Sequence, residues 1–287
     1  MGDFYAEIRD ILESKASKLS TFTYKTYMSH LNKLQIYRPN VNCSEVTEAF
    51  VLGYMDFMRT RNNSEGTIYR SLSILRMLVK ALLRCHKISS DPMQNISLKR
   101  AKSQRKFLEV NELEMLYYSF RTQASKLNYG ERESIRAFLF SCFTGLRYSD
   151  LKKLTLQNVQ NGKIRIFTQK TGSQIYIPIP NQALELIFYQ DEHSKDSTGC
   201  VFHVVNNSTF NKNLRSASRK LGFQRYLHTH LARHTFATTC ITLGMPIEVV
   251  SKMLGHVNLQ TTLIYANYAN SVIDREMQKF QLKTPEL

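Results

Sequence analysis

The first third of the chain has the hydrophobic pattern of helices that pack together. Apolar residues recur every three or four positions up to about residue 97, and Gly and Pro are few. This period places the apolar side chains on one face of a helix. The pattern predicts three long helices, at residues 21–36, 44–59 and 64–85. Each needs the others to bury its apolar face, so we expect one helical domain.

The pattern changes to alternation of apolar and polar residues between positions 155 and 179, which indicates strands. Two turn signals divide this stretch, an Asn-Gly pair at Asn161 and the segment KTGS that begins at Lys170. We therefore expect a small antiparallel sheet. Pro178 would suit its outer edge, because proline cannot donate a hydrogen bond to a neighbouring strand.

The last part of the chain is helical again, with clear boundary signals. Thr229 can cap a helix that Gly244 closes, and Pro246 suits the first turn of a helix that ends before Gly255. Asn258 can start a further helix. Other helices are predicted at residues 181–189, 208–221 and 272–287.

These elements predict a mainly α fold with a small antiparallel β-sheet, of the α+β class. A chain of 287 residues can hold two hydrophobic cores. The boundary falls in the segment LKRAKSQRKF, which has no acidic residue, and Asn111 with Glu114 forms an N-cap pair just after it. We predict a helical domain at residues 1–97, a linker at 98–106, and a second domain at 107–287 whose tail is 271–287.

Charge adds a partner to this picture. Lys and Arg number 39 against 23 Asp and Glu, which gives a formal net charge of +16 at pH 7. Long-range attraction then favours a polyanionic partner, with nucleic acid as the first candidate. The basic linker could follow a phosphate backbone or serve as an ordinary solvated connection. Its cations, called here the linker cations, are Lys99, Arg100, Lys102, Arg105 and Lys106.

Cysteine usage and the absence of long apolar runs favour a cytoplasmic protein. The five cysteines lie tens of residues apart, and no CxxC pair suggests a zinc or redox centre. The N-terminal residues lack the apolar core of a signal peptide, and no apolar run approaches the ~18 residues that a membrane-spanning helix needs.

Four short motifs hold residues suited to cutting a phosphodiester bond without a metal. That reaction needs a nucleophile, positive charge on the non-bridging oxygens and a proton for the leaving alkoxide. Arginine suits the second task because its planar fork binds phosphate oxygens in pairs. His230 and Arg233 are three residues apart on one predicted helix, so their side chains can project to the same side. The motifs are TGLRYSDL, QKTG, HLARHTFAT and LGHVNLQTTLIY.

In this order and with this spacing, the motifs resemble those of the tyrosine recombinase (phage integrase) family, of the Xer type or of mobile-element integrases. The resemblance covers about residues 107–270. Its most specific parts are the HxxR pair and LGH followed nine residues later by tyrosine. It implies a catalytic domain at 107–287, a SAM-like core DNA-binding domain at 1–97, and site-specific DNA recombination without a cofactor or metal.

The resemblance also implies a role for each motif residue. Tyr265 would attack the scissile phosphate and form a 3′-phosphotyrosyl link, which conserves the bond energy so that no ATP is needed. Arg147 and Arg233 would hold the non-bridging oxygens, and Lys170 would protonate the leaving 5′ oxygen. Because an unperturbed tyrosine has a pKa near ~10, attack at neutral pH needs a base or strong local positive charge.

The remaining motif residues are acidic or histidine. By the same resemblance, His230 would assist proton transfer at the nucleophile, and His256 would hydrogen-bond the phosphate. Asp150 would support Arg147 without contacting the DNA, and His234 would have a structural role. The expected partners are double-stranded DNA and three further copies of the chain, in a homo-tetramer on two DNA sites. A tail after Asn270 could dock on a neighbouring copy to couple the active sites.

Three alternative functions remain open on the sequence. A zinc hydrolase would use His228, His230 and His234 as ligands, but no Glu follows His230 as HExxH requires. A helix-turn-helix regulator would use residues 229–254, although the apolar pattern of residues 247–254 resembles a core face more than a recognition helix. A type IB topoisomerase would use the same chemistry to relax DNA without recombining it.

Overall fold

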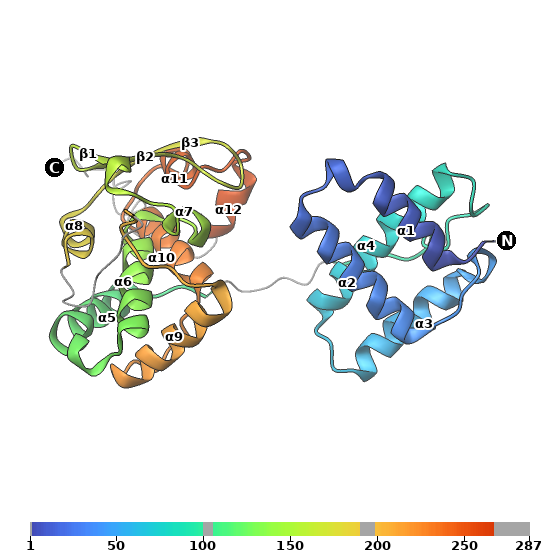
Figure 1. The fold of residues 1–287 in the computed structure, drawn as a ribbon, viewed down its shortest axis with the longest axis horizontal. Helices are drawn as coiled ribbons and strands as arrows, with labels where there is room; N and C mark the ends of the chain where they lie inside the picture. Colours follow the sequence, from blue (N-terminus) through green and yellow to red (C-terminus); the bar gives the residue numbers. More distant parts are fainter. Residues whose placement is uncertain (1, 100–105, 190–198, 267–287) are drawn as a thin grey trace, which may run out of the picture. The chain divides into compact units, whose positions relative to one another are not determined.

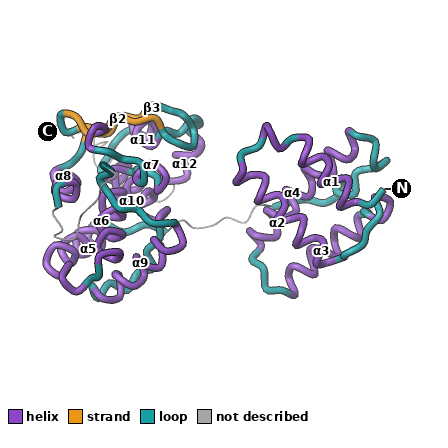
Figure 2. The backbone as a smooth tube through the Cα atoms, in the orientation of Figure 1, coloured by secondary structure: helices purple, strands orange, loops and turns teal. Residues whose placement is uncertain are grey.

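The computed structural model describes residues 2–99, 106–189 and 199–266. The chain divides into two compact units, Met1–Gln104 and Arg105–Leu287, called here the N-terminal unit and the C-terminal unit. Both are mainly helical, and all strands formed by the described residues lie in the C-terminal unit (Figure 2). The fold is therefore mainly α with a small antiparallel sheet, as the sequence predicts. No described helix is long and apolar enough to cross a membrane.

The N-terminal unit packs its helices around one hydrophobic core (Figure 1). Each α-helix begins at a side chain that accepts a hydrogen bond from a free backbone N–H of the first turn. These caps are Asp3, Ser20, Thr47 and Ser64. The described elements are α1 (Phe4–Ser14), η1 (Ala16–Lys18), α2 (Thr21–Tyr37), η2 (Cys43–Glu45), α3 (Glu48–Thr60) and α4 (Glu65–Arg84).

Two of the three predicted N-terminal helices match α2 and α4 to within one residue at each end. The third differs, because the helix predicted from residue 44 begins only after Thr47. The Glu45 carboxylate accepts a hydrogen bond from the Asn42 N–H at 2.8 Å and closes a separate 3-10 turn. Val46 then leaves the helical region, with ψ 77°. The structure also adds α1, which the prediction omits.

The C-terminal unit is built around helix α6 (Tyr129–Thr144), most of whose residues are buried. Helices α8, α9 and α10 all contact it. The first helix of the C-terminal unit begins at Val110 with Glu109 as N-cap, so the cap predicted at Asn111 is wrong by two residues. The other described helices are α5 (Val110–Gln123), η3 (Ala124–Lys126), α7 (Tyr148–Leu151), η4 (Leu156–Asn158), α8 (Asn181–Ile187), α9 (Asn207–Lys220), α10 (Thr229–Thr242), α11 (Ile247–Leu254) and α12 (Gln260–Ala266).

The sheet has three antiparallel strands in the order β1 (Val159–Gln160), β2 (Lys163–Phe167) and β3 (Gln174–Pro178). The alternation that predicts strands begins at residue 155, but the first strand begins only at Val159 because residues 156–158 form η4. Asn161 and Gly162 both have positive φ, 51° and 69°, which is the geometry of the tight turn that joins β1 to β2. Pro178 lies in β3, an edge strand of this sheet, as expected.

A small second core joins α10, α11 and α12. Val250 and Leu254 of α11 are fully buried in it, so the apolar face of α11 packs inward, as the sequence suggests. His228, and not Thr229, occupies the N-cap position of α10. Tyr265 of α12 also belongs to this core and is 3% exposed. The motif residues thus lie where these three helices meet the end of α6.

Candidate active site

Gly145 ends helix α6 and lets the TGLR segment pass close to two other helices. Its φ is +70°, a conformation that L side chains rarely adopt, and its N–H donates to the Ser141 carbonyl at 2.8 Å. A Cβ added here would lie 2.5 Å from Phe236 Cδ1 and 2.9 Å from Leu254 Cδ2. The glycine therefore permits the close approach of α6 to α10 and α11 that brings their polar residues together.

Arg147 follows at the N-cap of the one-turn helix α7, which carries Asp150. The side chain of Asp150 is buried, and its Oδ1 accepts a hydrogen bond from the Gln169 N–H at 3.0 Å. Among the described residues, Arg147 Nη1 and Asp150 Oδ2 are buried without a hydrogen-bond partner. Burial lowers the pKa of Arg147, against the opposing effects of the negative charge of Asp150 and of Tyr265 when it is ionised.

Arg233 is almost fully buried, and its guanidinium group ties three segments together. Nη1 donates to the Gly145 carbonyl at 2.8 Å, and Nη2 donates to the Leu254 carbonyl at 2.6 Å. Burial, and then the positive charge of Arg147, lower the pKa of Arg233 to about 9. The group remains cationic at neutral pH, so two positive guanidinium groups lie near each other in the site.

The tautomer of His256 follows from its two hydrogen bonds. Arg233 Nη2 lies 3.0 Å from His256 Nε2, and arginine can only donate, so Nε2 accepts. The proton of the neutral ring is then on Nδ1, which donates to Thr262 Oγ1 at 2.8 Å. Thr262 is fully buried on α12, so this bond fixes the ring relative to the helix that carries Tyr265.

Tyr265 places its hydroxyl next to a histidine of α10. The hydroxyl lies 3.0 Å from His234 Nδ1, and the two ring centroids are 5.5 Å apart. The exposed ring of His230, one turn earlier on the same helix, stacks near His234 at 6.4 Å. Both Arg147 and Arg233 lie close enough for the charge of Tyr265 to affect the pKa of each guanidinium group.

Lys170 lies exposed in the turn between β2 and β3. Two contacts hold this turn beside the site: the bond from the Gln169 N–H to Asp150, and a longer one at 3.4 Å from Thr171 Oγ1 to the Gly255 carbonyl. Gly255 has φ +60°, and an added Cβ would lie 2.8 Å from Ile175 Cγ2. This close approach of α11 to the hairpin brings the turn to the connection that carries His256.

The structure thus gathers the predicted site residues from α7, α10, α12 and the connection between α11 and α12, and it holds the Lys170 turn alongside. Sequence reasoning gave His234 only a structural role, and nothing in the spacing indicated that its ring meets the Tyr265 hydroxyl. Of the linker cations, Lys99 and Lys106 are exposed. The other three, Arg100, Lys102 and Arg105, lie outside the described residues.

An apolar groove with a volume of about 770 Å³ adjoins the site. Its polar lining residues include His256 and Ser173. We call it the α11 groove and define it by its apolar lining residues, Phe143, Tyr176, Phe236, Cys240, Met245, Val249 and Met253.

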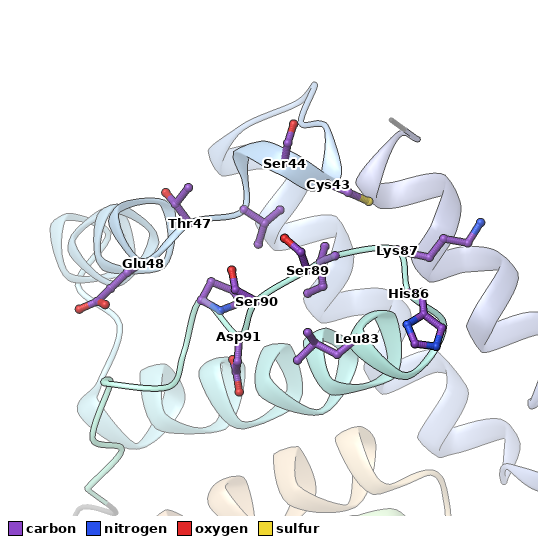
Figure 3. Close-up of a pocket in the computed structure, with 13 residues that line it drawn as sticks. Cys43, Ser44, Thr47, Glu48, Leu83, His86, Lys87, Ser89, Ser90 and Asp91 are labelled. Atoms are coloured by element: carbon purple, nitrogen blue, oxygen red, sulfur yellow. The ribbon is translucent and has the colours of Figure 1, made fainter.

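The N-terminal unit has a separate hollow of about 730 Å³ between the end of α4 and the start of α3 (Figure 3). It is lined by hydroxyl side chains such as those of Ser89 and Ser90 and by charged side chains of both signs, among them Lys87 and Asp91, and no motif residue lines it.

Across the three described ranges, no group of three or more His, Cys, Asp or Glu side chains is arranged to hold a metal ion. The histidines of the zinc-hydrolase alternative therefore do not form a ligand set there.

Family models match both units of the chain. The phage integrase family matches residues 106–271, and the phage integrase SAM-like domain matches residues 3–99. Relatives align along most of their length. The tyrosine recombinase XerC of Natranaerobius thermophilus is 27% identical over 91% of this chain and 93% of its own. The tyrosine recombinase XerD of Shewanella oneidensis is 26% identical over 93% and 92%.

Solved structures share the fold at lower identity. A lambda integrase fragment in a dimer bound to a COC′ core site has a TM-score of 0.76 at 16% identity, and covers 92% of this chain and 95% of that one. The Tn1549 transposon integrase in complex with transposon right end DNA has a TM-score of 0.75 at 14% identity, with 96% and 100% covered.

The chain belongs to the phage integrase family, and it is a tyrosine recombinase, a DNA breaking and rejoining enzyme of site-specific recombination. The type IB topoisomerase and helix-turn-helix regulator alternatives are not favoured by these matches.

Proposed function

We propose that Tyr265 is the nucleophile that cleaves DNA and forms a 3′-phosphotyrosyl intermediate. One feature carries the proposal: Tyr265 lies in the same cluster as Arg147 and Arg233, close enough that its negative charge, once ionised, raises the pKa of both guanidinium groups. Positive charge close to the hydroxyl favours the phenolate form of Tyr265 over the phenol, as attack at neutral pH requires. The same charge would stabilise the extra negative charge of a pentavalent transition state.

Arg147 and Arg233 would bind the non-bridging oxygens of the scissile phosphate. Arg147 Nη1 is buried without a hydrogen-bond partner among the described residues, and such a donor lowers its free energy when a ligand accepts from it. Arg233 is oriented by two backbone carbonyls. His256 would donate to the phosphate from Nε2. Because that atom now accepts from Arg233, the histidine must first gain a proton on Nε2, either as imidazolium or as the other neutral tautomer, in which Nδ1 accepts from the Thr262 hydroxyl.

Lys170 would protonate the leaving 5′ oxygen. It lies in the exposed turn between β2 and β3, from which its side chain would reach a bound duplex. Its ammonium group is exposed, and the turn is tied to Asp150 and to Gly255 on either side. Asp150 would hold the Lys170 turn in place through its hydrogen bond from the Gln169 N–H, and its negative charge would help to position Arg147. His230, exposed one turn before His234, would face the DNA and assist proton transfer.

Residues 1–97 would form a core DNA-binding domain, and the linker cations would follow the phosphate backbone between the two domains. The match of the N-terminal unit to the SAM-like domain of phage integrases supports the first role. The net charge of +16 and the exposure of Lys99 and Lys106 support the second. Because its substrate is DNA, the enzyme would act in the cytoplasm of a bacterial cell like those of its relatives.

The test is a covalent adduct on DNA. A binding sequence is first selected from random duplexes, and nicks are then placed along it so that cleavage releases a short strand and traps the protein. We expect the wild type to be trapped and Tyr265→Phe to bind DNA without an adduct. Tyr226→Phe is the matched control, because Tyr226 is 60% exposed on the same unit. Trapping of Tyr265→Phe at the wild-type level would refute the assignment.

We further propose that four copies assemble on two DNA sites and that residues 272–287 of one copy dock in the α11 groove of the next. A lambda integrase tetramer bound to a Holliday junction has this fold, with a TM-score of 0.75. The groove is mostly apolar and adjoins the site, and the tail carries Val272, Ile273, Met277 and Phe280 in its sequence. Such docking would couple neighbouring active sites.

Deletion of residues 272–287 tests the docking proposal. It should lower strand exchange between two sites far more than binding to one site. Val249→Glu, which puts a charge into the groove from a side chain that is 43% exposed, should have the same effect. Equal loss of binding and exchange in the deletion variant would contradict the proposal.

A further inference from the structure

The hydroxyl of Tyr265 has a titratable partner that the resemblance to the family does not assign. His234 Nδ1 lies 3.0 Å from this oxygen, within the range of a direct hydrogen bond. The rings are tilted by 51°, with centroids 5.5 Å apart, and helices α10 and α12 that carry them are in contact. The contact is therefore built into the packing of the small second core.

From this geometry we propose that His234 is a catalytic residue, the general base that accepts the phenol proton of Tyr265. This inference rests on the proposed nucleophile and deepens it. When the Oη–P bond forms, the proton of Oη moves to His234 Nδ1, the P–O5′ bond breaks, and the 5′ oxygen takes a proton from Lys170. In the reverse step Lys170 recovers its proton from the 5′ hydroxyl, and His234 returns the other to the leaving phenolate.

The surroundings of His234 favour the neutral ring before attack. Arg147 and Arg233 both lie close enough to Tyr265 for its charge to affect their pKa values, and the Tyr265 hydroxyl is 3.0 Å from His234 Nδ1. Positive charge near this ring disfavours an imidazolium. A neutral histidine with an unprotonated Nδ1 is the form that can accept the proton.

The other charged and titratable groups determine what happens after the transfer. His230 stacks near His234 from the same helix, His256 is bonded to Arg233, and Asp150 is the buried carboxylate of α7. A protonated His234 would add to the positive charge here. The scissile phosphate brings a negative charge into the same cluster, so the imidazolium becomes favourable only when DNA is bound. Proton transfer is thereby linked to substrate.

The deciding variant is His234→Asn, whose amide can replace the hydrogen bond of Nδ1 but cannot take up a proton. We expect its rate of adduct formation on nicked DNA to fall by about 10²–10³ at neutral pH. The rate should recover as pH rises, because hydroxide then removes the phenol proton. His203→Asn, a surface histidine of the same unit, is the control and should keep the wild-type rate and pH profile.

Several outcomes would overturn the inference. A His234→Asn variant with the wild-type rate and pH profile would show that the histidine is not the base. A low rate that recovers with rising pH in His230→Asn but not in His234→Asn would assign the base to His230. A nitrogen-15 spectrum of the wild type without DNA adds a test that needs no stable variant: we expect an unprotonated Nδ1 for His234, and a protonated one contradicts the proposal. Failure of the wild type to form any adduct would instead count against Tyr265 and the proposed function.

Discussion

Replacement of Gly145 by alanine tests the close helix packing that assembles the active site. The residue has φ +70°, and adoption of this left-handed conformation costs an alanine about 1–2 kcal/mol. The new methyl group would also lie 2.5 and 2.8 Å from two atoms of the Phe236 ring and 2.9 Å from Leu254 Cδ2. Overpacking of this kind costs about 1–3 kcal/mol. The expected loss in the free energy of unfolding is therefore about 2–5 kcal/mol.

Gly222→Ala separates the two contributions. Gly222 also has φ +70° and lies in the same unit, but no atom lies within 4 Å of its added Cβ. The Gly222→Ala variant should therefore show the free-energy cost of the left-handed backbone without that of crowded side chains. The change in the entropy of the unfolded chain is common to both variants. The difference between the two variants, about 1–3 kcal/mol, measures the packing of Gly145 against α10 and α11.

Urea unfolding followed by far-ultraviolet circular dichroism is the suitable assay, because the chain contains no tryptophan for fluorescence. Gly145→Ala should also lower adduct formation more than Gly222→Ala, since the Gly145 carbonyl accepts the hydrogen bond that orients Arg233. If the two variants unfold at the same urea concentration, the close approach of these helices is not a constraint, and the reasoning fails.

Three further changes should give measurable effects. Arg233→Lys keeps the charge but not the planar fork, so adduct formation should fall by about 10²–10³ while DNA binding persists, and a wild-type rate would show that the fork is not needed. Burial lowers the pKa of His30, so the unfolded state takes up a proton first below about pH 6.5 and stability falls toward acid pH. His30→Gln should remove part of this loss, measured as the difference in urea midpoint between about pH 7 and about pH 5. Replacement of all five linker cations by glutamine should lower the magnitude of the slope of log K against log salt by about 4.5, and an unchanged slope would mean that they do not contact phosphate.

Much of the fold was predictable from local pattern. The period of apolar residues gave α2 and α4 to within a residue at each end, because both have long apolar faces and a serine cap. The Asn161-Gly162 turn was equally clear, since few residue pairs adopt two positive φ angles. Predictions failed where two signals compete within a few residues, as at the start of α3, where the Asn42 and Glu45 pair closes a turn that the helical period runs through.

The site residues were indicated by the order and spacing of motifs, which the sequence records directly. The order and spacing of the motifs did not show which role each residue has, because a histidine of α10 can face any of several groups until the helices are packed. His230 and His234 are four residues apart on one helix, and spacing alone puts both on the same side. Only the contact of α10 with α12 brings His234 to the Tyr265 hydroxyl and leaves His230 exposed.

By itself, the sequence determined most of the helical and strand segments and the basic character, and it indicated the candidate site residues. These depend on local periodicity, turn residues and net charge, all of which act over a few positions or over the whole chain. The tertiary structure decided which atoms meet: Arg233 with two carbonyls and His256, and Tyr265 with His234. Those pairings depend on the close approach of helices at Gly145 and of α11 to the β2–β3 hairpin at Gly255, where a single methyl group would not fit without a shift of its neighbours.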